Sequence, residues 1–188
     1  MKPAGDVILK DEWSVESISH ADAVACVESW HYAAGASNTS VARHGLFSLG
    51  GELCGAALWM PPTPAAGKAV AGDEWRGVLS LSRLVVAPDL PTNAASFLLG
   101  RSMRMVDRKR WPVLLTYADT RLGHTGAIYR ATNWTDQGEV PAGDVWIGPE
   151  GQQRGRKRGG RNLTADEMRA LGFRRTPNLP KRRFVHAC

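Results

Sequence analysis

The apolar positions near the N-terminus predict an amphipathic helix. Within residues 20–32, Val24, Val27 and His31 recur at spacings that bring them to one helical face. That face is expected to point inward, because a surface helix buries its apolar side. The helix would therefore deliver His31 to the core or to the edge of a cleft.

Two apolar runs follow, at residues 45–49 and 52–60, with the pair Gly50 and Gly51 between them. Two such runs joined by two glycines predict a tight hairpin, from which a meander of antiparallel strands would continue. Residues 61–72 are rich in proline, alanine and glycine. Because proline cannot continue a central strand, we expect a surface loop there.

The middle of the chain alternates between strand and helix patterns. Residues 78–87 and 112–119 predict buried strands, and regular alternation would run through the first of them. Between the two strands a helix is expected to begin at Thr92 or Asn93 as N-cap. Its last turn would hold the basic residues 108–110, which suit the negative end of the helix dipole.

The C-terminal part carries weaker signals. Residues 127–134 predict a short helix, and residues 163–173 predict another, because Thr164 and Glu167 form a capping-box pattern. The segment 151–162 has low complexity, and we expect no regular structure in it. The closing KRRFVHA either adds a last strand or lies on the surface.

This order of elements predicts a single α/β domain, with a mixed central sheet flanked by helices. Residues 1–150 would form the body, and residues 151–188 a basic extension packed partly on it. The body carries 13 Lys or Arg and 16 Asp or Glu side chains, whereas the extension carries 11 and two. Because phosphate contacts release condensed counterions, this asymmetry favours a polyanionic partner. The alternative is a merely solvated end.

Within the extension, Arg156, Lys157 and Arg158 lie among glycines, a pattern that suits flexible contact with the phosphates of DNA. No stretch has the length of apolar sequence that a membrane span needs, and the N-terminus lacks a secretory pattern. We therefore expect a cytoplasmic protein without membrane contact. Cys26, Cys54 and Cys188 are widely spaced, which predicts reduced thiols.

Side chains of catalytic type gather in the block TYADTRLGHTGAIYRATNW. Asp119 ends its predicted strand, at the edge where open α/β sheets form ligand clefts, so it is a candidate general base or metal ligand. A turn or capping aspartate is the equal alternative. Gly123 and Gly126 flank His124, in a loop that could bring its imidazole close to a ligand.

A second candidate group lies at the end of the N-terminal helix. His31 and Tyr32, with Asp119, form a donor set that iron accepts, although the spacing alone is a weak signal. For a lone histidine on an apolar helix face, a core histidine is the preferred alternative. Tyr129 and Trp134 could stack on an extruded base, but such rings fill cores more often.

The segments LSRLVVAPDLPTNAASFLLG and TYADTRLGHTGAIYRATNWTDQG, with WHY upstream and KRRFVH at the end, resemble the phage Mom family from about residue 30 to 188. The resemblance implies a GNAT-like fold and bound iron. It also implies a transferase that converts the 6-amino group of adenine in bacteriophage DNA to a carbamoylmethylated form, which protects that DNA from host restriction enzymes.

The resemblance further implies roles for individual residues. The catalytic group would be Asp119, Tyr32, Tyr117, His124 and Ser82. Iron would be held by His31, Tyr32 and Asp119. The group donor would contact Arg83, Asn93 and Ser96. DNA would contact Tyr129, Asn133, Trp134, Arg156, Lys157 and Arg158.

The donor itself is left open by the sequence. GNAT enzymes hold the pyrophosphate of acyl-CoA at a helix N-terminus, and the helix near Asn93 offers such a place. The loop APDLPTNAAS lacks the glycine-rich pattern usual there, so acetyl-CoA cannot be assumed. Two alternatives stay open: a GNAT N-acyltransferase for a protein or small-molecule amine, and a noncatalytic DNA-binding phage protein. A homodimer also stays open.

Overall fold

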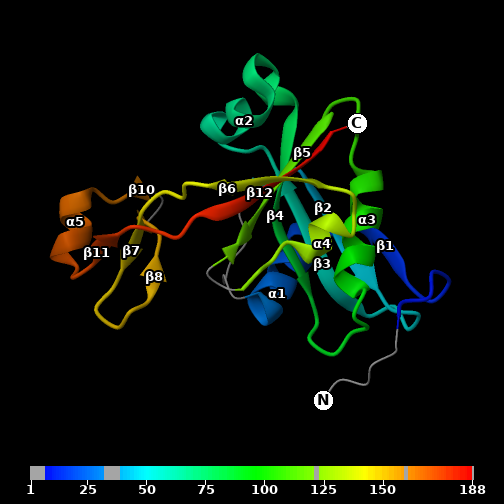
Figure 1. Ribbon diagram of the computed structural model, residues 1–188. Helices are drawn as coiled ribbons and strands as arrows, with labels where there is room; N and C mark the ends of the chain where they lie inside the picture. The colour runs from blue at the N-terminus through cyan, green and yellow to red at the C-terminus, as the bar shows by residue number, and fades with distance from the viewer. Residues whose placement is uncertain (1–6, 32–38, 121–122, 159–160, 188) are drawn as a thin grey trace.

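A seven-stranded sheet forms the centre of the molecule, seen here in a computed structural model that describes residues 7–31, 39–120, 123–158 and 161–187 (Figure 1). In spatial order its strands are β1 (Ser14–Ser17), β2 (Ala42–Phe47), β3 (Leu53–Met60), β4 (Val78–Val86), β5 (Val113–Asp119), β12 (Lys181–Ala187) and β6 (Thr135–Val140). Neighbouring strands are antiparallel, except for the parallel pair of β4 and β5. The mixed central sheet is thus confirmed.

Helices cover both faces of this sheet. On one face lie α1 (His20–Trp30) and α2 (Pro64–Ala71), and on the other lie α3 (Ala94–Met105) and the short α4 (Ala127–Arg130). The predicted N-terminal helix is confirmed, and the Ser19 hydroxyl caps it by accepting the Asp22 N–H at 3.1 Å. No helix in the described parts of the chain is long and apolar enough to cross a bilayer.

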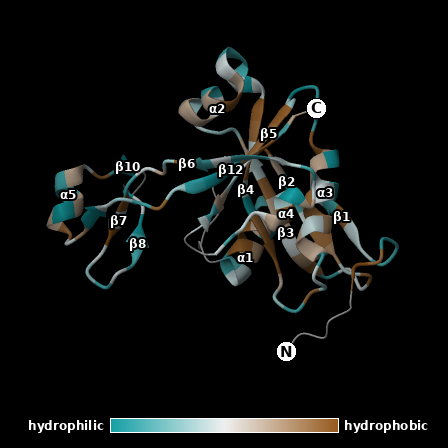
Figure 2. Cartoon of the chain, in the orientation of Figure 1, coloured by the Kyte–Doolittle hydropathy of each residue, from teal (hydrophilic) through white to brown (hydrophobic). Residues whose placement is uncertain are grey.

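The core follows from this layering. Between the sheet and α3 lies a large apolar cluster that includes Trp59, Leu98 and Phe184, all fully buried. On the opposite face, α1 buries Cys26 and Val27 against β3 and β4. Figure 2 shows the same division, with hydrophobic colour along the central strands and the inner sides of the helices. Cys26 and Cys54 are free thiols, as expected.

Residues between β6 and β12 form a small projection, which we call the arm (Figure 1). It holds β7 (Val145–Ile147), β8 (Gln153–Arg154), β9 (Lys157–Arg158), β10 (Arg161–Asn162), α5 (Ala165–Ala170) and β11 (Arg174–Thr176). Trp146, Leu163 and Met168 make its apolar core, and the predicted capping box of Thr164 and Glu167 is present. Segment 151–162 contains short strands, so the expectation of no regular structure there was wrong.

Two further expectations about elements were wrong. Residues 61–72 are not a loop, because the Thr63 hydroxyl accepts the Ala66 N–H and Pro64 occupies the first turn, which starts α2. Helix α3 ends at Met105 instead of residue 110, because the Asp107 carboxylate accepts the N–H groups of the next turn.

The C-terminal segment pairs deep inside the sheet. Strand β12 lies between β5 and β6, with Lys181 opposite Asp119 and Arg183 opposite Tyr117. These residues belong to the predicted basic extension, which the structure divides into the arm and a strand of the central sheet. Because side chains alternate along a strand, Lys181 and Arg183 share the face that α2 covers.

A buried polar group ties α3 to the sheet. The Ser102 hydroxyl accepts the Trp59 indole N–H at 2.7 Å and lies 2.6 Å from Nδ1 of His44. Burial lowers the pKa of His44 to about 4, so the ring is neutral at pH 7 and can accept the hydroxyl proton. The three side chains therefore satisfy one another without a net charge.

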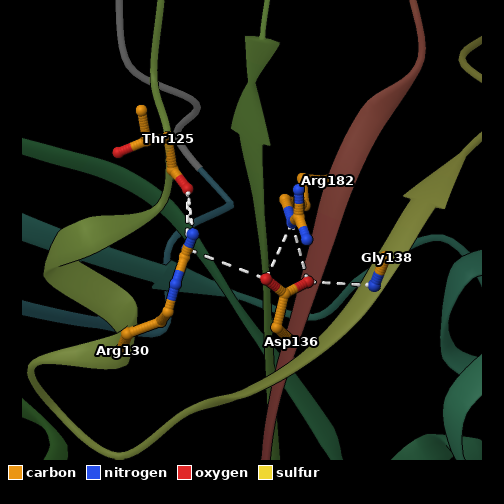
Figure 3. Close-up of polar contacts among 5 residues, drawn as sticks. All are labelled: Thr125, Arg130, Asp136, Gly138 and Arg182. Atoms are coloured by element: carbon orange, nitrogen blue, oxygen red, sulfur yellow. Dashed lines mark hydrogen bonds and ion pairs between the residues drawn. The ribbon is translucent and has the colours of Figure 1, made fainter.

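A second polar group ties α4 to the sheet edge (Figure 3). The Asp136 carboxylate on β6 accepts Nε of Arg182 at 2.7 and 2.9 Å and the Gly138 N–H at 3.0 Å, and lies 3.7 Å from Arg130. Burial acts to raise the pKa of Asp136, but the hydrogen bonds and the two guanidinium charges outweigh it and lower the pKa. Arg130 in turn holds the Thr125 carbonyl, at 2.7 and 2.9 Å.

Substitution of Ser102→Ala removes the partner shared by Trp59 and His44. Because two buried polar groups then lose their hydrogen bonds, we expect the free energy of unfolding to fall by about 2 kcal/mol. Urea denaturation of the purified protein measures it. Ser17→Ala on the exposed strand β1 is the control and should change the value by less than about 0.5 kcal/mol. Equal stability of the two variants would contradict this account of the core.

Substitution of Asp136→Asn should lower the free energy of unfolding at pH 7 by up to about 1 kcal/mol, the range for solvent-screened ion pairs. The folded pKa lies below the ordinary value of an aspartate, so this stabilisation is complete above that ordinary value and is lost as the pH falls through the folded pKa. The free energies of unfolding of the wild type and Asp136→Asn, measured by denaturation, should therefore differ less at pH 3 than at pH 7. Asp89→Asn, on an exposed turn, is the control, and a difference that persists unchanged at pH 3 would argue against the network.

Candidate functional site

The parallel strands β4 and β5 pair over only part of their length. Val78–Ser80 pair with Val113–Leu115, yet β4 continues to Val86 and β5 to Asp119. A small pocket opens where this pairing ends, between the two continuing strands, and we call it the strand cleft. An opening of this kind inside a sheet gives a ligand access to buried backbone and side chains.

Ser82 marks the point at which β4 changes its register. Leu58 of β3 pairs with Arg83, while the next residue, Trp59, pairs with Leu81, so Ser82 is a bulge. Its hydroxyl donates to the Leu58 carbonyl at 3.0 Å. A bulge bends the strand and re-aims its side chains, so the regular alternation expected along residues 78–87 is interrupted here.

The strand cleft brings together side chains that are far apart in the sequence. Six of the predicted site residues line it: His31, Ser82, Arg83, Tyr117, His124 and Tyr129. Its volume is about 90 Å³, well below the range of about 300 to 1,000 Å³ that is usual for sites that enclose a whole ligand. The cleft therefore suits the reacting end of a larger ligand.

Tyr117 and Arg183 form a cross-strand pair beside the cleft. Burial raises the pKa of Tyr117, and the charge and hydrogen bond of Arg183 only partly oppose this. The phenol is therefore neutral at pH 7 and can donate a hydrogen bond. Nε of Arg83 and Nε of Arg183 are buried without a hydrogen-bond partner, while Nη1 of Arg83 donates to the Ser82 carbonyl at 2.7 Å. The cleft is thus bordered by two cationic side chains that keep unused donors.

The turn that carries His124 is held in place from two sides. Gly126 adopts φ +77°, and a Cβ atom there would collide with the ring of Phe184 on β12, so only glycine fits. Thr125 is held by the Arg130 guanidinium, which reaches the Asp136 carboxylate (Figure 3). The position of His124 therefore depends on contacts with β6 and β12.

Two of the predicted DNA-contacting aromatic residues belong to the core. Trp134 is 4% exposed, stacks on Trp59 with ring centroids 6.4 Å apart, and donates its indole N–H to the sulfur of Met103. This burial contradicts a role for Trp134 in stacking on an extruded base. Tyr129 packs on Trp134 and Phe184 but also borders the strand cleft.

The other predicted contacts lie at separate places. Asn93 does not cap α3 with its side chain; it accepts the Ile8 N–H at 2.7 Å instead, and the Ser96 hydroxyl donates to the Asn93 carbonyl at 2.9 Å. Asn133 adopts φ 64° in the turn after α4. Ser96 and Asn133 line a separate basic cavity of about 470 Å³. Its other lining residues include Lys10, Arg101, Arg104 and Arg108.

The predicted iron ligands are described only in part. His31 borders the strand cleft and Asp119 ends β5, whereas Tyr32 lies outside the described residues. Among the residues that the structure describes, no three His, Cys, Asp or Glu side chains are close enough to hold a metal ion. Because the predicted set includes a tyrosine that lies outside the described residues, this search does not test it, and iron stays a prediction that depends on the resemblance.

Two larger cavities adjoin the strand cleft on opposite faces of the sheet. The α3 cavity, of about 340 Å³, shares Leu84, His124 and Tyr129 with the cleft and reaches Ala95 in the first turn of α3. The α2 cavity, of about 870 Å³, shares Tyr117 with it. The cleft therefore shares lining side chains with two spaces, from which two different ligands could approach it.

The α2 cavity contains residues that sequence reasoning missed. Asn178, Lys181 and Arg183 line it together with Gln153 of the arm. Lys181 and Arg183 were visible in KRRFVHA, and alternation would have placed both on one face of a strand. Their partner strand could not be read from the sequence, since β12 and β5 pair across more than fifty residues.

The arm displays exposed cations, including Arg154, Arg156 and Arg174. Others are paired: Arg175 with Asp144 at 2.8 Å, and Arg161 with Glu167 at 2.5 Å. Lys157 and Arg158 form β9, but their side chains lie outside the described part of the chain. The predicted contact of this segment with DNA stays a prediction.

The fold is similar to that of GNAT acetyltransferases of known structure. A variant of spermidine N-acetyltransferase SpeG from Vibrio cholerae superposes with a TM-score of 0.57 at 7% identity, over 95% of both chains. SpeG in complex with CoA and spermine gives 0.55 at 7% identity, over 95% of this chain and 96% of that one. A Bacillus subtilis acetyltransferase in complex with CoA gives 0.52 at 7% identity, over 94% and 98%.

Sequence comparison points to a narrower group. Methylcarbamoylase mom of Escherichia phage Mu is 30% identical over 128 residues, which cover 65% of this chain and 52% of the phage protein. The matched region thus spans about half the length of that relative. The sequence profile of the Mom protein family matches residues 12–143, which include β4, β5 and the turn with His124. On this match over most of its length, the chain belongs to the Mom protein family.

Proposed function

We propose that this protein is a transferase that adds a carbamoylmethyl-type group to the exocyclic 6-amino group of adenine in phage DNA, and so protects that DNA from host restriction enzymes. The observation that carries the proposal is the strand cleft, which joins cavities on opposite faces of the sheet at Tyr117 and His124. A transfer between two ligands needs such a meeting point. Membership of the Mom protein family and similarity to the methylcarbamoylase of phage Mu support the type of reaction.

The chemistry makes two demands on the site. The lone pair of the adenine amine is delocalised into the ring, so the amine must be oriented and relieved of a proton as it attacks. In the transfer, the amine nitrogen bonds to the donor carbon, the bond from that carbon to its leaving group breaks with its electron pair, and the amine proton passes to a base. Positioning and proton transfer of this kind are what an enzyme supplies.

The cleft contains side chains suited to both demands. The imidazoles of His31 and His124 border it and are candidates for the base. Tyr117, neutral because burial raises its pKa, can donate a hydrogen bond to the departing group. Asp119 ends β5 two residues further on, and we assign it an orienting role. The Ser82 hydroxyl already donates to the Leu58 carbonyl, so Ser82 would contribute by holding the bulge that shapes the cleft.

The donor would enter through the α3 cavity. Ala95, in the first turn of α3, lines that cavity, and free backbone N–H groups at a helix N-terminus attract phosphate. A carrier that bears phosphates would therefore be held with its reactive end toward His124. Two of the similar acetyltransferases were solved with CoA, which is compatible with such a carrier, but the identity of this donor is not assigned.

The central test is the mass of nucleosides from plasmid DNA of cells that express the protein. The wild type should yield deoxyadenosine with the added mass of a carbamoylmethyl group. Tyr117→Phe and Asp119→Ala should reduce it by about a hundredfold or more, as loss of a proton-transfer or orienting group does. His20→Gln, at the start of α1 and outside the cleft, is the matched control.

Deoxyadenosine of unchanged mass from wild-type cells would refute the proposal. Acetylation of spermidine or of a peptide amine by acetyl-CoA would then favour the N-acyltransferase alternative. Full modification by Asp119→Ala would remove the orienting role of that side chain. DNA binding should survive in both catalytic variants, since neither side chain belongs to the arm.

Contact of the arm with DNA is tested by salt dependence. Arg154→Gln with Arg156→Gln removes two exposed cations, so the slope of log affinity against log salt should become shallower by about 1.4 to 1.8. Fluorescence anisotropy with labelled DNA measures it. Arg169→Gln, whose guanidinium pairs with Asp166 at 2.6 Å, is the control and should change the slope less. An unchanged slope would indicate that these arginines are solvated and do not contact DNA.

A further inference from the structure

We propose that the α2 cavity is the binding site for the target nucleotide, with the adenine extruded from its stack and its amino group directed past Tyr117 into the strand cleft. This inference depends on the proposed function and adds the place and the residues that receive the substrate. It separates the two ligands: the donor approaches from the α3 face of the sheet and the base from the α2 face.

Size is the first argument. The strand cleft, of about 90 Å³, is much smaller than the α2 cavity and suits the amino group of a larger ligand. The α2 cavity, of about 870 Å³, lies within the range of about 300 to 1,000 Å³ that is usual for ligand sites. It shares Tyr117 with the cleft, so a base seated there has its edge next to the candidate reacting groups.

The wall formed by α2 explains why the space is open. The helix turns Ala65, Ala66 and Ala69 to the cavity, and none of these side chains extends beyond Cβ. Ala66 also packs on the core, whereas Ala69 is exposed. The helix can therefore border a planar ring without filling the volume that the ring needs.

The charges in the cavity match a nucleotide. Lys181 and Arg183 line it, and no carboxylate does so among the described residues. Asp119 is near, directly across from Lys181 on β5, but it does not line the cavity. Arg183 hydrogen-bonds Tyr117 and also lines the cavity, so its guanidinium offers positive charge to a phosphate there.

The amide side chains in the cavity match adenine. Asn178 and Gln153 line it from the arm side. An asparagine or glutamine amide pairs with N7 and one N6 hydrogen of adenine, which leaves the other N6 hydrogen to face the cleft. The side-chain oxygen Oδ1 of Asn178 accepts the N–H of Leu179 at 3.0 Å, which fixes the orientation of the side-chain amide. We assign Asn178 the discrimination of adenine from other bases.

The test compares two labelled single strands of fifteen nucleotides, one of thymine only and one with a single central adenine. The wild-type protein should bind the adenine strand about tenfold more tightly, the scale of one amide–adenine pair. Ala69→Trp fills the cavity from an exposed helical position and should abolish this preference while leaving the affinity for the thymine strand unchanged. Asn178→Ala should also abolish it, and without added bulk.

Leu49→Trp, on a turn where the side chain is 79% exposed, is the control for bulk and should keep the preference. Equal thermal unfolding of Ala69→Trp and the wild type checks the fold. No adenine preference in the wild type, or a preference that survives in both Ala69→Trp and Asn178→Ala, would overturn the inference.

The outcome is separable from that of the proposed reaction. If cells yield modified adenine but the cavity variants keep full modification and full preference, the nucleotide site is misplaced while the transferase proposal stands. If the preference follows the cavity variants but no adenine is modified, the binding site stands and the reaction assignment fails.

Discussion

The partial pairing of β4 and β5 is the constraint on which the rest of the site depends. Parallel strands that stay paired leave no passage through a sheet, because their ladder closes the gap. Here the ladder stops after Ser80 and Leu115, and the bulge at Ser82 turns the following residues of β4. The strand cleft exists because of this local loss of pairing, and both neighbouring cavities are useful only because it connects them.

The neighbouring elements keep this opening from collapsing. On one side Phe184, Gly126 and the Asp136 network hold the turn with His124 against β12 and β6. On the other side Tyr117 and Arg183 support each other across the β5 and β12 pair. Strand β12, the last along the chain, therefore supports both sides of the cleft, which explains why so many contacts of the site involve it.

Local patterns in the sequence predicted most of the elements. Periodicity and capping signals identified α1, the β2 and β3 hairpin, β4, β5 and α5, since these depend on residues close in the chain. The position of His31 at the cleft was predictable because this side chain directly follows a helix. The bulge at Ser82, the burial of Trp134 and the position of Lys181 and Arg183 depend on pairing between distant segments, which no local pattern carries.

The arm leaves the body after β6 and returns at β12, and these two strands are neighbours in the sheet. An insertion whose ends emerge side by side can change in length or sequence without shifting the register of the strands that flank it. The surface of the arm can therefore diverge while the pairing of the central sheet stays the same.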